Sequence, residues 1–418
     1  MADKKPLMLD QVIPLDKAGE LLTDQIKKIP EEIRTINSAL MDLSKVSNTS
    51  LPELETHFSE LARSAGNLGI SVSDMINATA DWSRMGYSLP DSKKLAEITA
   101  LYRNISKGID IETANQSLAV ILQEFKIDAS NALKIVDQIN ALSKNSLSDN
   151  AGIAQALQIS APSFSNTNTD PSRSLALIAG TNSVVPDVKA VGEMWNTVAA
   201  KIYGTSQELG TIGTDTNGIL TSSAKLRDQI KDITGFDIIS DQSDTQLKDI
   251  YDIVIGIGTE WKNLSAADQN GLLESLAGSE HGNILNAALN NISAIKDAYK
   301  TAENCTGSAL ASQDAYEQGI QFSLDRLEAS FQTFAAHILN SDLLKGIIDF
   351  GNGAVSILDT VTDKLGSMGT IGLGAGLFAS LKNIGKCRIS VRISKSILLL
   401  VLNMPFMPKG FMKYKLQG

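Results

Sequence analysis

The sequence predicts an all-α fold, and three of its properties lead to that prediction. Of 418 residues, 43% are hydrophobic but only 5% are aromatic, so small aliphatic side chains have to form the core. Every strongly patterned segment repeats its apolar residues at three- or four-residue steps, the period of a helix. Ser, Asp and Gly recur between these segments, where helices begin and end. The length allows about two or three packed units.

Residues 1–50 are expected to form an N-terminal amphipathic helical segment. Its apolar residues draw one stripe along a helix that Pro30 breaks or kinks. A single stripe of this kind requires a partner, either further copies in a coiled coil or the next helices of the chain. The stripe consists of Leu15, Leu22, Ile26, Ile29, Ile33, Ile36, Leu40, Leu43 and Val46.

Residues 51–204 are predicted to form a core of short antiparallel helices joined by tight Gly/Ser/Asp turns. Similar turns, called joints below, begin at Gly69, Gly86, Gly108 and Lys126. Each offers a residue suited to left-handed backbone, then an apolar residue that packs back, then a Ser or Asp that caps the next helix. We therefore expect positive φ at Gly69, Gly86 and Gly108. Short connections make neighbouring helices antiparallel or stack them at right angles.

The later segments are predicted with less regular connections. Residues 161–186 are expected to be a loose connection that holds a short helix at 175–179, and residues 205–223 a loop. The 205–305 region is predicted to form a second helical set, with a turn at 278–282. Residues 306–363 are predicted as a long amphipathic helix over 308–344 and a connector.

Residues 364–418 form a tail with a different composition. No acidic residue follows Asp363, so 28 basic and 47 acidic residues give residues 1–363 a net charge of −19, and the tail carries nine basic residues. Residues 365–381 lack charge and contain five glycines. These glycines suit a membrane or pore helix, buried helix packing or a flexible linker, and all three interpretations stay open. They are Gly366, Gly369, Gly372, Gly374 and Gly376.

The residues that usually carry chemistry form no recognisable pattern. Cys305 and Cys387 are far apart and are expected to be reduced thiols. His57, His281 and His337 lack the spacing of a metal site. Gly385-Lys386 fails the phosphate-loop pattern at two positions. The sequence therefore predicts no enzyme, no cofactor and no metal, and the acidic body argues against specific nucleic-acid binding.

The order of several short segments resembles the core region of phage tail tape measure proteins, the family found in long-tailed phages and prophages. The similarity extends over about residues 50–385. After residue 387 the sequence loses its acidic, Ala-rich composition, as expected of a truncated or frameshifted copy or of one piece of a split gene. The segments that carry the resemblance are Leu61–Ser71, Trp82–Ser88, Leu118–Ile127, Ala156–Pro162, Val191–Trp195 and Leu272–Gly282.

The resemblance implies a structural protein of the virion, made in the bacterial cytoplasm and placed in the tail lumen. It implies tail tube and tail assembly proteins as partners, self-association, a role in setting tail length, and contact with the host membrane during DNA passage. The alternative hypothesis is a membrane-active helical bundle protein of bacterial origin. In that case the acidic body would deliver the Gly-rich segment to a bilayer.

Overall fold

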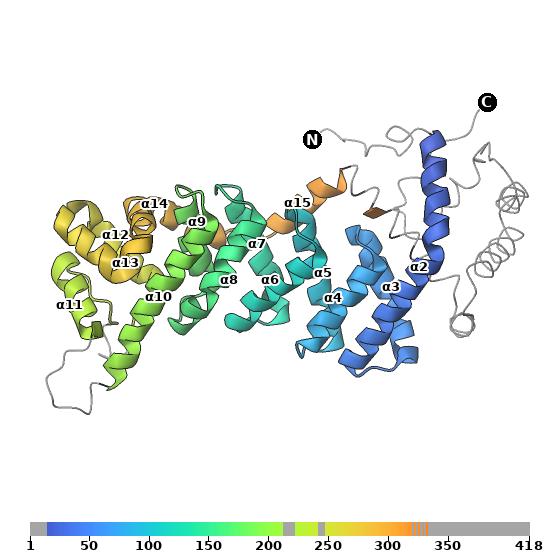
Figure 1. Ribbon diagram of the computed structural model, residues 1–418, viewed down its shortest axis with the longest axis horizontal. Coiled ribbons are helices and arrows are strands. Elements are labelled where there is room, and N and C mark those ends of the chain that lie inside the picture. The colour runs from blue at the N-terminus through green and yellow to red at the C-terminus, as the bar shows by residue number, and fades with distance from the viewer. Residues whose placement is uncertain are drawn as a thin grey trace, which may run out of the picture. The chain divides into compact units, whose positions relative to one another are not determined.

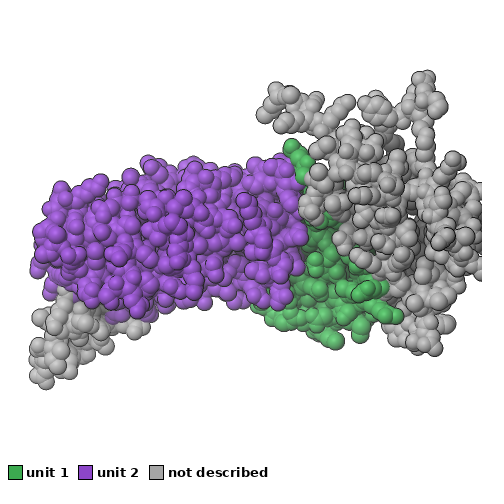
Figure 2. Space-filling model, turned by 45° about the horizontal axis from the view of Figure 1, so that its top comes forward, with its two compact units in different colours: residues 1–93, 317–418 green, residues 94–316 purple. Residues whose placement is uncertain are grey.

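The computed structural model describes residues 15–211, 222–240 and 247–319, together with five single positions between 322 and 332. The prediction of an all-α fold is confirmed: these residues form helices, and their only β-type pairing is an isolated bridge between Ile239 and Leu247. The helices divide into two compact units, residues 1–93 with 317–418 and residues 94–316 (Figure 2).

The first unit is built on three helices (Figure 1): α2 (Leu15–Ser47), α3 (Leu51–Leu68) and α4 (Val72–Arg84). α2 packs against both α3 and α4. Its stripe residues Ile33, Ile36 and Leu43 are buried, as an amphipathic helix with packing partners requires. Pro30 does not break the helix, because α2 continues through that residue; the alternative, a kink at Pro30, stays a prediction. The boundary between the units falls within α5 (Leu89–Ile105).

The second unit continues as a succession of short helices (Figure 1). Within it, α8 packs against α10, and α9 packs against α14. Its largest fully buried side chains include Trp195, Trp261 and Phe164. Each indole has a hydrogen-bond acceptor, since Trp195 Nε1 donates to Leu177 O at 3.1 Å and Trp261 Nε1 to Asn286 Oδ1 at 3.1 Å. The helices are α6 (Ile111–Glu124), η1 (Ala129–Asn131), α7 (Ala132–Ser143), α8 (Asn150–Asn166), α9 (Pro171–Asn182), α10 (Val188–Thr211), α11 (Ser222–Thr234), α12 (Ile250–Glu260), η2 (Trp261–Asn263), α13 (Ala266–Asn290), α14 (Ile292–Glu303) and α15 (Ser308–Glu317).

Glycines allow helices of this unit to approach closely. A Cβ atom built on Gly192 would lie 2.8 Å from Ala156 Cα, which shows how near α10 comes to α8. A Cβ atom on Gly180 would lie 2.5 Å from Ile295 Cα, at the crossing of α9 and α14. At the first crossing only backbone atoms of α8 lie next to the glycine, whereas at the second both the backbone and the side chain of Ile295 do.

Two predicted connections and one predicted helix differ from the structure. The loose 161–186 segment is mostly helical: α8 runs through Pro162 to Asn166, and α9 begins at Pro171. Phe164 is buried and holds the last turn of α8 in the core. The 205–223 segment is helical as far as Thr211. The helix predicted over 308–344 is interrupted, because α15 ends at Glu317.

The predicted turn at 278–282 is narrower than expected. Gly278 adopts φ +72° and ψ 180°, and helix resumes directly after it until Asn291 separates α13 from α14. One residue in a left-handed, glycine-only conformation is therefore enough to redirect the chain there.

Candidate functional site

Three of the four joints, those at Gly69, Gly86 and Lys126, share one hydrogen-bonding scheme. At the end of a helix, the backbone N–H of a residue donates to the carbonyl five positions earlier, which is the bond of a Schellman cap. The donor and acceptor pairs at these joints are Ile70 and Ala65, Tyr87 and Trp82, and Ile127 and Leu122, at 2.8 to 3.3 Å. The same bond joins Thr169 to Phe164 at the end of α8, at 3.0 Å.

The residue that closes each helix has left-handed backbone. Gly69, Gly86 and Gly108 have φ of 65, 96 and 71°, and Lys126 has φ of 52°. Without a Cβ, glycine adopts this conformation at little cost, whereas other residues are strained by about 1 kcal/mol. The three glycines thus lie where the chain reverses between helices.

Side chains at the same joints cap the next helix, with one exception. Ser71 Oγ accepts from Asp74 N at 2.9 Å, Ser88 Oγ from Asp91 N at 3.3 Å, and Asp110 Oδ1 from Thr113 N at 2.8 Å. The carboxylate of Asp128 caps nothing; a 3₁₀ turn at Ala129–Asn131 follows it instead. The expected cap therefore forms at three of the four joints.

Gly69 differs from the other joint glycines in its surroundings. A Cβ atom built there would lie 2.8 Å from the ring of Phe322, whereas nothing lies within 4 Å of a Cβ on Gly86 or Gly108. Phe322 itself is only 4% exposed. This joint of the first unit therefore receives a residue from far along the chain, a contact that no local sequence signal indicates.

Gln332 makes a second contact of the same kind in the first unit. Its Oε1 accepts from Val72 N, in the first turn of α4, at 2.6 Å. Its Nε2 donates to Glu32 Oε2 on α2 at 2.6 Å. One amide thereby joins the beginning of α4 to α2, and satisfies an N–H that has no partner within its own helix.

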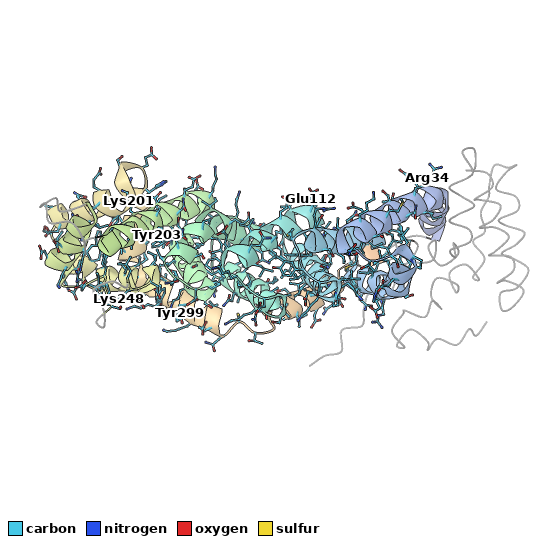
Figure 3. All side chains as sticks on the ribbon, turned by 90° about the horizontal axis from the view of Figure 1, so that it is seen from below. Arg34, Glu112, Lys201, Tyr203, Lys248 and Tyr299 are labelled. Atoms are coloured by element: carbon cyan, nitrogen blue, oxygen red, sulfur yellow. The ribbon has the colours of Figure 1, made fainter. Side chains whose placement is uncertain are left out.

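In the second unit, Arg173 on α9 joins that helix to α12. Its guanidinium pairs with Asp249 and with Asp252, the latter at 3.0 Å, and lies 5.4 Å from the ring centre of Tyr251 and 5.8 Å from that of Tyr299. Figure 3 labels Tyr299, which projects from α14. Burial raises the pKa of the Asp249 carboxyl, an effect that Arg173 and the Asp252 amide only partly offset. Since each charge has a partner, this cluster holds helices together.

Another ion pair closes the turn after α11. Arg227 donates to both carboxylate oxygens of Asp237, at 3.0 and 2.9 Å, and Lys231 adds a third bond at 3.0 Å. Arg227 holds the pKa of this carboxyl well below its usual range. The pair links α11 to the residues that follow it.

In the part of the chain that the structure describes, no three His, Cys, Asp or Glu side chains gather as metal ligands would. His57 lies 3.8 Å from Glu60, in a partly exposed pair three residues apart. Cys305 is a free, buried thiol, while Cys387 and His337 lie outside the described residues.

The candidate membrane segment is not among the described residues either. Gly366, Gly369, Gly372, Gly374 and Gly376 all lie beyond residue 332. Among the helices that are described, none combines the length and the apolar character needed to cross a bilayer.

Comparison with known proteins places the helical body in a family. No solved structure was found to match the chain. The model of the phage-related minor tail protein family matches residues 60–278, a stretch that runs from α3 to the Gly278 kink in α13. This match covers more than half of the chain and includes the joints at Gly69, Gly86 and Gly108. The chain therefore belongs to the phage-related minor tail protein family.

Proposed function

We propose that this minor tail protein is a tape measure, a helical scaffold of the tail lumen that sets tail length during assembly. The observation that carries the proposal is the family match over residues 60–278, because the described residues of this stretch form successive helices. The order of the short segments from Leu61 to Gly282 supports the narrower assignment. Tail tube subunits and assembly proteins are the proposed partners, and copies of the chain are proposed to associate with one another.

The folded units put a condition on this function. The described α-helices have between 10 and 33 residues, and even α2 spans only about 50 Å at 1.5 Å per residue. A wholly helical, extended chain would reach roughly 600 Å. A ruler therefore requires the helices to separate at their joints, where Gly69, Gly86 and Gly108 are points of easy backbone rotation.

Insertions into α2 test the ruler directly. Duplication of residues 15–32 adds 18 residues, which are five complete turns and keep the helical register. A double insertion adds 36 residues. If the extended chain sets tail length, the mean tail measured by electron microscopy should grow by about 27 Å and about 54 Å.

A matched control leaves the length of α2 unchanged and alters only its surface. Replacing the exposed Arg34 by another polar residue, and the exposed Met41 by a polar one, should leave the tail length as it was (Figure 3 labels Arg34). Intact particles whose tails stay at the original length with both insertions would remove the ruler proposal.

Membrane contact is a separate proposal that rests on the composition of residues 365–381. A synthetic peptide of this segment should release dye from anionic vesicles, while a version with the five glycines replaced by Ser and Asn should not. Equal leakage from both peptides, or none from either, would leave tail assembly as the function.

A further inference from the structure

Three polar side chains on one turn of α7 are buried. Asp137, Gln138 and Asn140 are 5, 1 and 4% exposed. Polar side chains at such positions are unusual, because removing them from water costs free energy unless partners replace the water. The Oε1 atom of Gln138 has no such partner among the residues described. A helix that only packed a core would have apolar residues here.

Most of the hydrogen bonds that these three side chains form are with one distant segment, residues 305–316, which we call the strap. Asp137 accepts from Gly307 N at 2.9 Å and from Ala309 N at 2.8 Å, so its carboxylate caps the amino terminus of α15. The Nδ2 atom of Asn140 lies 2.8 Å from Ser308 O and Ser308 Oγ, and 2.9 Å from Ser312 Oγ.

A neighbouring helix adds one more polar contact to the strap. Asn104 of α5 donates to Gln313 Oε1 at 3.2 Å. Asp137, Asn140 and Asn104 thus form a row of polar groups on α7 and α5, which we call the docking row. The row recognises backbone amides, a carbonyl, two hydroxyls and an amide oxygen of the strap.

Apolar burial contributes little to the same contact. Of the residues of α15, only Ala309 and Gln313 are buried, and Leu310 is 51% exposed. A ten-residue helix is also too short to be stable by itself in water. Hydrogen bonds contribute less net stability than their number suggests, because water replaces them on opening. The strap therefore belongs to the least stable part of the unit, which opens before the rest.

We propose that the docking row is a binding site for the amino-terminal turns of one helix, occupied in this chain by the strap, and that the strap is released while the helices α6 to α14 stay folded. The site recognises a helix whose first turns carry Gly, Ser and Ala, as the sequence Gly307–Ser312 does. The proposal concerns this contact alone and holds whether or not the protein measures tail length.

Cys305 gives a direct measure of strap release. It is the first residue of the strap and only 4% exposed, and burial raises the pKa of its thiol, so it reacts slowly while docked. In the full chain with Cys387→Ser, maleimide labelling of Cys305 reports how often the strap opens. The wild-type strap should be labelled far more slowly than the urea-unfolded chain.

Two variants weaken docking, and a third is the matched control. Ala309→Arg places a long cation at a fully buried position of α15. Asn140→Ala removes the contacts to Ser308 and Ser312, together with the acceptor of Asn150 Nδ2. Both should raise the labelling rate by about tenfold or more. Leu310→Arg, one position along the same helix, lies on the exposed side and should leave the rate unchanged. The melting transition of helices α6 to α14, followed by circular dichroism, should still be observed in all three variants.

A peptide tests the docking row as a binding site. A fluorescent peptide of residues 304–316, with Ser in place of Cys305, should bind the Ala309→Arg chain, whose own strap is displaced. It should bind neither the wild type nor the Ala309→Arg, Asp137→Asn double variant.

Three results would overturn the proposal. The first is a labelling rate in both docking variants no higher than in Leu310→Arg. The second is loss of the melting transition of helices α6 to α14 in both docking variants, which would make the strap an integral part of the core. The third is peptide binding that is as strong in the Ala309→Arg, Asp137→Asn double variant as in the Ala309→Arg chain.

Discussion

At Gly69 the backbone requires a left-handed residue, and the Phe322 ring leaves no space for a Cβ atom. Gly86 satisfies only the first of these conditions, because its surroundings are open. The two positions therefore separate the cost of backbone strain from the cost of a steric clash. The sequence could predict the first from the turn chemistry, but the second depends on a residue more than 250 positions away.

Replacing each glycine by Ala should distinguish these costs. Gly86→Ala should destabilise the first unit by about 1 kcal/mol, the strain of an L-residue in left-handed backbone. Gly69→Ala should cost about 1–3 kcal/mol more, because the ring of Phe322 has to move. Hydrogen exchange of the α3 and α4 amides, read by mass spectrometry, gives both values. Equal costs at the two positions would show that Phe322 does not restrict this joint.

Element boundaries were predictable where a capping residue marks them and not where tertiary packing decides. Ser71 and Asp110 begin helices as their residue types suggest. The helix through Pro162 was missed because proline normally ends a helix, although the buried Phe164 keeps this turn in the core. The Asp170-Pro171 pair at the start of α9, a cap followed by proline in the first turn, was a usable signal.

The docking row was hidden for a related reason. Asp137 and Asn140 lie in a part of α7, residues 135–140, in which every side chain is buried, and their partners begin about 170 residues later. Sequence periodicity describes which face of a helix is buried but contains no information about which distant backbone group meets it. Such buried polar contacts appear only once the helices are assembled.

At the scale of helix pairs, α10 offers two glycines in opposite situations. Gly192 lies against the backbone of α8, 2.8 Å from Ala156 Cα and O as measured from an added Cβ, while nothing lies within 4 Å of a Cβ on Gly204. Gly192→Ala should destabilise the second unit by about 1–3 kcal/mol through overpacking.

Gly204→Ala should stabilise the same helix by about 0.5–1 kcal/mol, because alanine has the higher helix propensity and loses less entropy on folding. Thermal unfolding of the full chain, followed by circular dichroism, compares the two variants. Changes of the same sign would contradict the close approach of α8 and α10.

At the scale of the whole molecule, the two units differ in how the chain builds them. The second unit is one continuous stretch, residues 94–316, with its own buried Trp195 and Trp261. The first unit combines residues 1–93 with residues after 316, and Phe322 and Gln332 supply part of its packing. Continuity of the chain should therefore decide which unit folds alone.

A fragment of residues 89–317, which keeps α5 and α15 complete, should fold by itself. We expect a helical circular dichroism spectrum, one cooperative melting transition and blue-shifted tryptophan emission, since the indoles of Trp195 and Trp261 are shielded from water. A fragment of residues 89–317 without a cooperative transition would show that the second unit needs the rest of the chain.

A fragment of residues 15–88 should melt at a lower temperature than the same fragment joined by a flexible linker to residues 317–332. The reason is that only the joined form can cover Gly69 with Phe322 and bind Val72 N through Gln332. A joined form that melts no higher than residues 15–88 alone would show that these two contacts do not stabilise the first unit.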